Sequence, residues 1–185
     1  MTFQNLSAAA LRDLTSVMEG ITDEAAETFM TELLAARRII LYGTGREGLM
    51  VKALTMRLYH LGLDAHYIGD MTTPPGSQGD LFVVAAGPGG STTVLALLDA
   101  AKAEGVRTLA VSAQPQGRAA QRADVFVHLP AQTMADDQQE RVSVLPMGSL
   151  FEIALLVFFD LMIVALRERR GESAEAMRDR HTNLE

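Results

Sequence analysis

The sequence contains no cysteine among its 185 residues. The chain therefore forms no disulfide, uses no thiolate nucleophile and offers no cysteine ligand to a metal. Its composition is otherwise that of a soluble globular protein, with 48% hydrophobic and 21% charged residues. At this length we expect a single domain, which buries roughly 70% of the surface that its unfolded chain exposes.

Basic residues are fewer than acidic ones: the chain has 16 Lys and Arg residues and 23 Asp and Glu residues, which give a net charge of −7. Nucleic acid is excluded as the main partner, because phosphate backbones require a basic surface. One small phosphate is still possible, since backbone amides at the start of a helix can bind it. His60, His66, His128 and His181 lack metal-ligand spacing, and we expect no metal.

Long hydrophobic runs are absent except for residues 150–166. This run is at the lower length limit for crossing a bilayer and contains Glu152 and Asp160. We expect a helix buried in the core or between subunits, and no membrane partner. Residues 1–5 lack the basic region of a signal peptide, which predicts a cytoplasmic protein.

Five short apolar segments alternate with segments of helical spacing. This order predicts an α/β fold with three layers, in which helices cover both faces of a five-stranded parallel sheet. We expect one domain with the following parts: N-terminal helices over 1–37, an α/β core over 38–130, a long apolar helix over 146–170 and a charged C-terminal tail over 171–185. The predicted strands are 38–42, 65–68, 81–86, 106–112 and 125–129, and 130–145 is a polar loop.

A glycine-rich turn follows the first predicted strand. Residues Gly43 to Gly48 read G-x-G-x-x-G, and Asp70 lies 22 positions further on, where a ribose-binding acid would stand in a dinucleotide site. A site for another phosphate, or a tight turn without ligand, fits the same pattern. The pattern alone leaves all three open.

A second glycine-rich turn, at residues 87–91, follows the third predicted strand. Parallel sheets bind ligands beyond the carboxyl ends of their strands, where both turns lie. Two turns that each carry hydroxyl groups favour a clamp on one compact phosphate ester, although Ser and Thr at helix starts are often plain caps. The candidate phosphate-binding residues are Gly43, Thr44, Gly45, Arg46, Gly87, Gly89, Ser91 and Thr92.

Glu152 stands one turn into the apolar helix. Burial raises the pKa of a carboxyl towards values useful for proton transfer, which makes Glu152 a candidate general base. The alternative is an acid that complements the dipole at the helix start.

Several segments together resemble the 6-phospho-3-hexuloisomerases of the sugar isomerase (SIS) family, over nearly the whole chain. The similar segments are 43–46, 56–62, 79–81, 123–125, 146–152 and 180–185. The segment that ends at Glu152 and the C-terminal ending are the most specific of them.

The resemblance implies a flavodoxin-like sheet, a homotetramer and no cofactor. It also implies interconversion of 3-hexulose 6-phosphate and fructose 6-phosphate through an enediol. In this interpretation Glu152 shuttles the proton, His60 is an acid or ring-opening group, and His181 approaches the site of a neighbouring subunit.

The second turn departs from the family pattern. The family usually reads S-G-S-G-E-T where this chain has Ala86 to Ser91, and Glu47 replaces a usual serine. Because hydroxyl donors are missing, we expect weaker phosphate binding or a different phosphorylated sugar. The alternatives are a SIS protein that binds a phosphosugar without turnover and, less favoured, a dinucleotide-binding protein.

Overall fold

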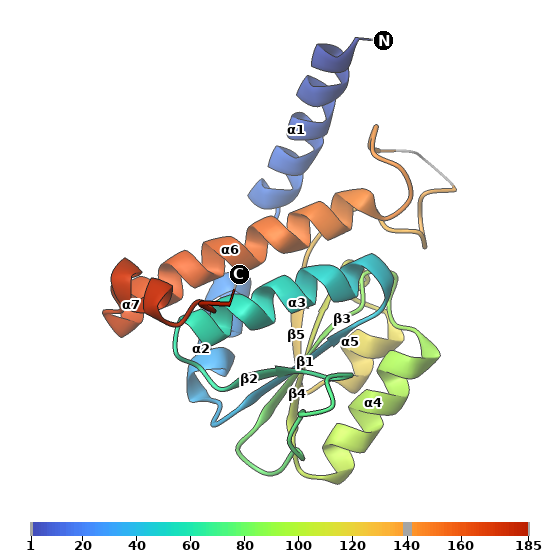
Figure 1. Ribbon diagram of the computed structural model, residues 1–185. Helices are drawn as coiled ribbons and strands as arrows, with labels where there is room; N and C mark the ends of the chain where they lie inside the picture. Colours follow the sequence, from blue (N-terminus) through green and yellow to red (C-terminus); the bar gives the residue numbers. More distant parts are fainter. Residues whose placement is uncertain (1, 139–141, 185) are drawn as a thin grey trace.

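The computed structural model describes residues 2–138 and 142–184, so residues 139–141 of the predicted polar loop lie outside it. Five parallel strands form one sheet in the order β2-β1-β3-β4-β5 (Figure 1). The strands are β1 (Ile39–Gly43), β2 (Ala65–Tyr67), β3 (Leu81–Ala85), β4 (Arg107–Ser112) and β5 (Val125–His128). The predicted five-stranded, flavodoxin-like parallel sheet is confirmed.

The neighbouring strands β1 and β3 are apolar on both sides because helices cover both faces of the sheet. In β1, Ile39 and Leu41 belong to the larger core cluster, together with residues of α2, α3 and α6. Ile40 belongs to the smaller cluster on the opposite face, with Phe82 and residues of the fourth helix. The result is the predicted three-layer arrangement.

The helices divide between the two faces as Figure 1 shows. One side carries α1 (Phe3–Glu19), α2 (Asp23–Ala35), α3 (Gly45–His60), α6 (Ser149–Arg170) and α7 (Ala174–Asp179). The other side carries α4 (Thr92–Ala103) and α5 (Arg118–Arg122). Gly20 ends the first of the two N-terminal helices, and the Thr22 hydroxyl caps the second by accepting from the Ala25 amide at 3.1 Å.

The long apolar helix α6 has the length and composition of a membrane-spanning helix, but half of its most apolar stretch is buried inside this chain. Its inner face packs on the core, where Phe158 lies with its ring centroid 5.3 Å from that of Phe29. Its outer face exposes Leu161 and Val164 by 52% and 49%. The expected core helix is present, and it also has a second apolar face.

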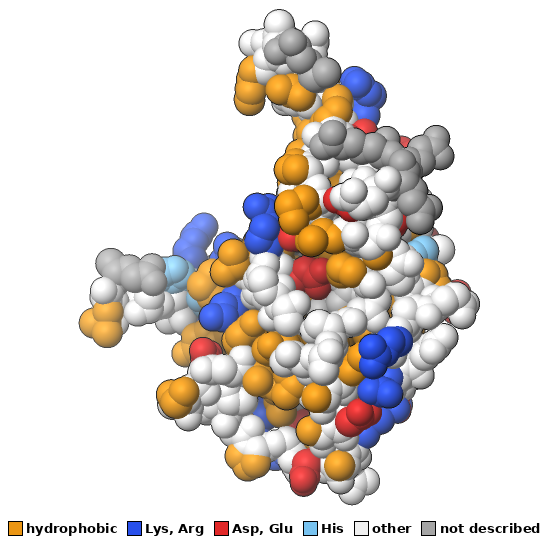
Figure 2. Space-filling view, turned by 90° about the vertical axis from the view of Figure 1, so that its right-hand side faces the viewer, with side chains coloured by type: hydrophobic (Ala, Val, Ile, Leu, Met, Phe, Trp, Pro, Cys, Tyr) orange, Lys and Arg blue, Asp and Glu red, His pale blue; other side chains and the backbone are white. Residues whose placement is uncertain are grey.

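Helix α1 projects away from the body and contacts it mainly through α6 (Figure 1). Val17 is its buried residue, whereas Phe3 at its free end and Leu11 at its middle are 78% and 61% exposed. Hydrophobic side chains run along one side of this projection onto the body below it (Figure 2). A single copy of the chain leaves this apolar surface largely in water.

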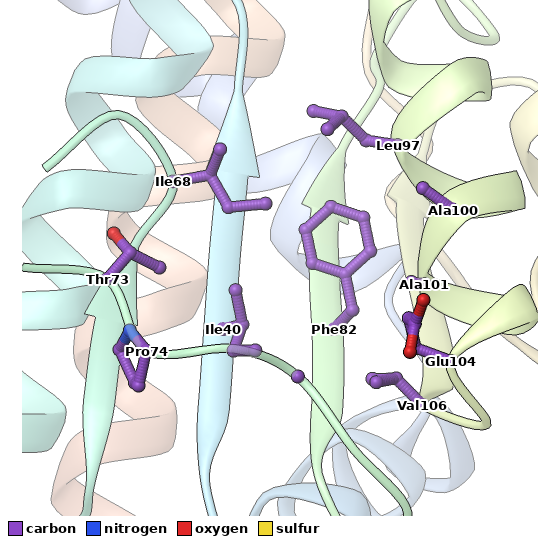
Figure 3. A pocket seen from close by; sticks show the side chains of 11 residues that line it. Ile40, Ile68, Thr73, Pro74, Phe82, Leu97, Ala100, Ala101, Glu104 and Val106 are labelled. Carbon is purple, nitrogen blue, oxygen red and sulfur yellow. The ribbon is translucent and has the colours of Figure 1, made fainter. Parts of the chain in front are cut away.

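The connection between β2 and β3 contains no helix among its described residues, which include the whole of 68–80. On the face of the sheet that α4 covers, an apolar cavity of about 190 Å³ lies between α4 and the connection from β2 to β3. Figure 3 shows Thr73 and Pro74 on one side, Leu97 on the other and the strand residues Ile40 and Phe82 between them. This cavity lies away from the two glycine-rich turns.

The charged C-terminal tail is folded and contains α7. Arg180 explains the order, since its Nη1 donates to the His60 carbonyl at 2.8 Å and its Nη2 donates to Glu172 at 3.2 Å. A guanidinium stabilises the unpaired carbonyls at a helix C-terminus. The tail therefore lies against the end of α3.

Candidate active site

The two glycine-rich turns face each other because β1 and β3 are neighbours in the sheet. The strand order reverses at this point, which is where open α/β sheets bind ligands. The N-termini of α3, α4 and α6 lie at the same side of the molecule (Figure 1). Residues from all three helix starts line one cavity of about 310 Å³. Its lining comprises Thr44, Gly45, Arg46, Glu47, Ala86, Pro88, Gly90, Ser91, Val94, Met134 and Glu152.

The first turn holds α3 tightly on β1. A Cβ at Gly48 would lie 2.5 Å from the Gly43 carbonyl oxygen, so only glycine fits. The Tyr67 hydroxyl donates to that same carbonyl at 2.8 Å. Thr44 is the N-cap residue of α3, and within the described chain its hydroxyl makes no capping bond, which leaves it free to bind a ligand.

The second turn has few free donors. The Gly87 amide donates to Glu47 at 3.1 Å, Pro88 has no amide proton, and the Gly89 amide donates to the Ala86 carbonyl at 2.8 Å. Each of these positions would otherwise offer an amide to an anion. The loop is therefore a poorer anion cradle than its glycine content suggests.

The start of α4 supplies the remaining hydrogen-bond donors on this side of the cavity. Ser91 caps the helix, since its hydroxyl accepts from the Val94 amide at 3.3 Å, and it also lines the cavity. The amides of Thr92 and Thr93 come before that of Leu95, which donates to the Ser91 carbonyl at 3.0 Å, and they have no partner within the helix. These amides, with the helix dipole, can bind one anionic oxygen group.

Glu152 reaches the cavity from α6 and is paired with Arg46 from α3. The Arg46 Nε donates to Glu152 Oε2 at 2.5 Å. The Glu152 side chain is 15% exposed, whereas that of Arg46 is 63% exposed. Burial makes the carboxylate accessible chiefly from the cavity, and its solvated partner can turn towards a ligand.

Glu47 is the site residue that sequence reasoning missed. Burial raises the pKa of its carboxyl to about 7, the Gly87 amide opposes this, and the negative charge of Glu152 adds to it. The replacement of a usual serine by an acid was visible in the sequence, but only the fold places its side chain under the second turn. A Cβ at Gly87 would lie 2.8 Å from Glu47 Oε1, so the carboxyl fits closely against the glycine.

His60 and His181 lie at the other end of α3. Their ring centroids are 5.3 Å apart. Burial lowers the pKa of His60, and the charges of Arg57 and His181 lower it further. A 16-residue helix is about 24 Å long, so a single chain does not bring these histidines to Glu152.

Asp70 is not part of the cavity between the turns. It lines a separate cavity with Lys52 and Tyr67, on the outer side of α3. Within residues 2–138 and 142–184, no group of three His, Asp or Glu side chains stands close enough to hold a metal ion. The geometry thus favours one small anionic ligand over a dinucleotide.

Comparison with known proteins agrees with this geometry. A family model described as the SIS domain matches residues 32–157. The chain belongs to the SIS family. A 3-hexulose-6-phosphate isomerase from Bacillus subtilis (strain 168) is 33% identical to this SIS protein over 96% of each chain. One of the same description from Mycobacterium gastri is 34% identical, over 94% of this chain and 92% of the relative.

Solved structures show the same architecture. A crystal structure of a hypothetical protein from Methanococcus jannaschii, for which the function of 3-hexulose-6-phosphate isomerase was inferred, superimposes on this SIS protein with a TM-score of 0.83. The two share 25% sequence identity over 96% of this chain and 98% of the other. The Vibrio vulnificus NanR protein, solved in complex with ManNAc-6P, has a TM-score of 0.76 over 95% of this chain and 66% of its own. At 17% sequence identity, this similarity supports the fold alone.

Proposed function

We propose that this SIS protein is an isomerase that interconverts 3-hexulose 6-phosphate and fructose 6-phosphate through an enediol. The observation that carries the proposal is the position of Glu152, which reaches from α6 into the cavity between the two turns. Relatives that match nearly the whole chain and are described as 3-hexulose-6-phosphate isomerases support it.

The phosphate binds at the helix starts. The hydroxyls of Thr44 and Ser91, which line the cavity, donate to its oxygens, as do the amides of Thr92 and Thr93 in the first turn of α4. The dipoles of α3 and α4 favour its negative charge. Arg46, which pairs with Glu152, supplies a charged donor from the cavity wall. The sugar carbons then extend towards α6.

The reaction requires one carbon-bound proton to leave and return to the neighbouring carbon. A carboxylate that is 15% exposed and aimed into the cavity suits this task, because one group can take the proton and give it back on the same face. The chemistry needs no redox partner, since the substrate and the product are isomers.

The experiment is to incubate the protein with fructose 6-phosphate in D₂O and to follow the sugar by NMR. A new ketose phosphate that carries deuterium at the exchanged carbon is the expected result. Binding without product or deuterium would favour a phosphosugar-binding protein without turnover, the second candidate, which the scarcity of donors in the Gly87–Ser91 turn supports.

We further propose that the protein is a cytoplasmic homo-oligomer, as a tetramer. The exposed apolar surfaces of α1 and of the outer face of α6 support this, because patches of this kind on a soluble protein usually mark contacts between subunits. Light scattering at micromolar concentration should give a mass several times 20.0 kDa. A stable monomer would contradict the proposal.

A further inference from the structure

The cavity between the turns contains a second carboxyl group whose chemistry the proposed function leaves unused. Glu47 lies in the first turn of α3, and Glu152 lies in the first turn of α6. Both line the same cavity of about 310 Å³, a size at the lower end of small-molecule sites. A ligand that fills this cavity touches both acids.

The surroundings of the two carboxyl groups differ. Glu152 forms an ion pair with the guanidinium of Arg46. Glu47 has one bond from an uncharged backbone amide, that of Gly87, and faces the negative charge of Glu152. Two acids in unlike surroundings can hold opposite protonation states at the same pH, and such a pair can divide the roles of base and acid.

Few other charged groups face Glu47 within the described residues. Arg46 comes from its own helix and Glu152 from α6, while the turn after β3 contributes no ionisable side chain. From β2, the Tyr67 hydroxyl is engaged with the Gly43 carbonyl. From the loop after β5, Asp136 accepts from Thr133 and Gln114.

We propose that Glu47 is a further catalytic residue of this site, which carries the proton that moves between the two oxygens of the substrate while Glu152 carries the proton that moves between the two carbons. The inference rests on the proposed isomerisation. Glu47 lies where it can reach a sugar oxygen, and it holds a proton in the neutral range because burial raises its pKa to about 7.

The steps balance without any other reagent. Glu152 removes the proton from the carbon beside the carbonyl, the C–H pair becomes the C=C bond, and the carbonyl oxygen takes the proton of Glu47. The resulting enediol returns the proton of its other hydroxyl to Glu47 as the new carbonyl forms. The C=C pair then takes the proton from Glu152, so both carboxyl groups end as they began.

The Gly87 amide helps to orient this acid. It donates to Glu47 Oε2, and this leaves Oε1 as the oxygen that can carry the proton. Because Gly87 has no side chain, the carboxyl can lie against the turn, where a Cβ would crowd Oε1 at 2.8 Å. The Gly87–Ser91 turn, which offers few amides to an anion, thus positions the carboxyl group of Glu47.

The test is the pH profile of the purified full-length protein and its Glu47→Gln variant, with fructose 6-phosphate. Glutamine keeps an acceptor for the Gly87 amide but has no acidic proton to transfer to the substrate. We expect the wild-type kcat to fall above about pH 7, and the variant to lose roughly 10²-fold in kcat and to lose that descending limb. Its Kd for fructose 6-phosphate, from calorimetry, should stay within about threefold of the wild-type value, since general acid–base work acts on the chemical step.

A variant with wild-type kcat and an unchanged profile overturns the role of Glu47. Loss of affinity at unchanged kcat overturns it as well, because Glu47 would then act in binding alone. If Glu47→Gln does not fold, Glu47→Ser provides the same comparison. A wild-type protein that binds the sugar phosphate but does not isomerise it refutes the proposed function and this inference with it. That result differs from the two outcomes above, in which the wild type is active and only the role of Glu47 is overturned.

Discussion

The two ends of α3 carry polar clusters of opposite character. At the N-terminal end, Glu47 and Glu152 line an open cavity, where a ligand can reach them. At the C-terminal end, His60 is 5% exposed and lies beside His181 and Arg180 of the folded tail. The first cluster is built for contact with a small molecule. In the second cluster His60 is buried, and since the length of α3 separates it from Glu152, it can serve the first only across a contact between copies.

The sharpest way to test this contrast is to remove the base at the N-terminal end. Glu152→Gln keeps the shape of the side chain and removes its ability to take a proton. We expect kcat to fall by roughly 10²–10⁴-fold, or about 3–5 kcal/mol. Steady-state kinetics with fructose 6-phosphate measure the loss.

Asp160→Asn is the matched control, since this acid is exposed on the same helix and away from the cavity. It should leave kcat within about twofold of the wild-type value, because exposed charges away from the site contribute little. Near-normal turnover in Glu152→Gln would remove Glu152 from the chemistry and leave the N-terminal cluster without its assigned base.

The next largest expected effect is on the free energy of unfolding, which is measured without substrate. The folded pKa of Glu47 is about 7 against an ordinary value of 4.5, so this group stabilises the fold at low pH, and the stabilisation is lost as the pH rises through 7. Glu47→Gln should therefore be more stable than the wild type at pH 8, by about 2–3 kcal/mol. Urea unfolding at pH 5 and pH 8 measures the difference.

Glu24→Gln is the comparison here, because Glu24 also lies in the first turn of a helix but is exposed. It should show no gain at pH 8. A Glu47→Gln variant whose stability relative to wild type is the same at both pH values would mean that the carboxyl is already ionised at pH 5. The N-terminal cluster would then be two carboxylates, and not an acid beside a base.

The C-terminal end of α3 should matter less. His60→Asn removes the ring but keeps a polar side chain, and we expect a loss of about tenfold in kcat, or about 1.4 kcal/mol. Mixed oligomers give the sharper result. When Glu152→Gln and His60→Asn chains are co-assembled, activity above the mean of the two parents indicates sites shared between copies. Activity equal to that mean indicates that no site combines Glu152 of one copy with His60 of another.

Sequence reasoning predicted the strands well because each is a short apolar run that ends in glycine or a polar turn. It also found both turns and Glu152, since those signals are local. It missed Glu47, whose environment depends on the neighbouring strand order and on the Gly87 turn some 40 residues away. It gave no sign of how the tail folds, because the contact of Arg180 with the end of α3 spans 120 residues and leaves no local pattern.

The smallest expected effect concerns the second glycine-rich turn, residues 87–91. Pro88→Ser restores one amide and adds one hydroxyl beside the cavity, so the Kd for fructose 6-phosphate should tighten by about three- to tenfold. Pro88→Ala separates the two contributions, because it restores the amide alone. Gly90 is best left unchanged, since its φ of 113° and a Cβ position 3.1 Å from the Ala119 Cβ would strain any side chain there.

Isothermal titration of the three proteins decides how the turn works. Successive tightening from wild type to Pro88→Ala to Pro88→Ser would mean that the turn faces the phosphate and that its lost donors weaken binding. Equal affinities would mean that the phosphate sits wholly on the start of α4, where the amides of Thr92 and Thr93 lie. In that case the turn faces the sugar, and its remaining task is to hold Glu47 through the Gly87 amide.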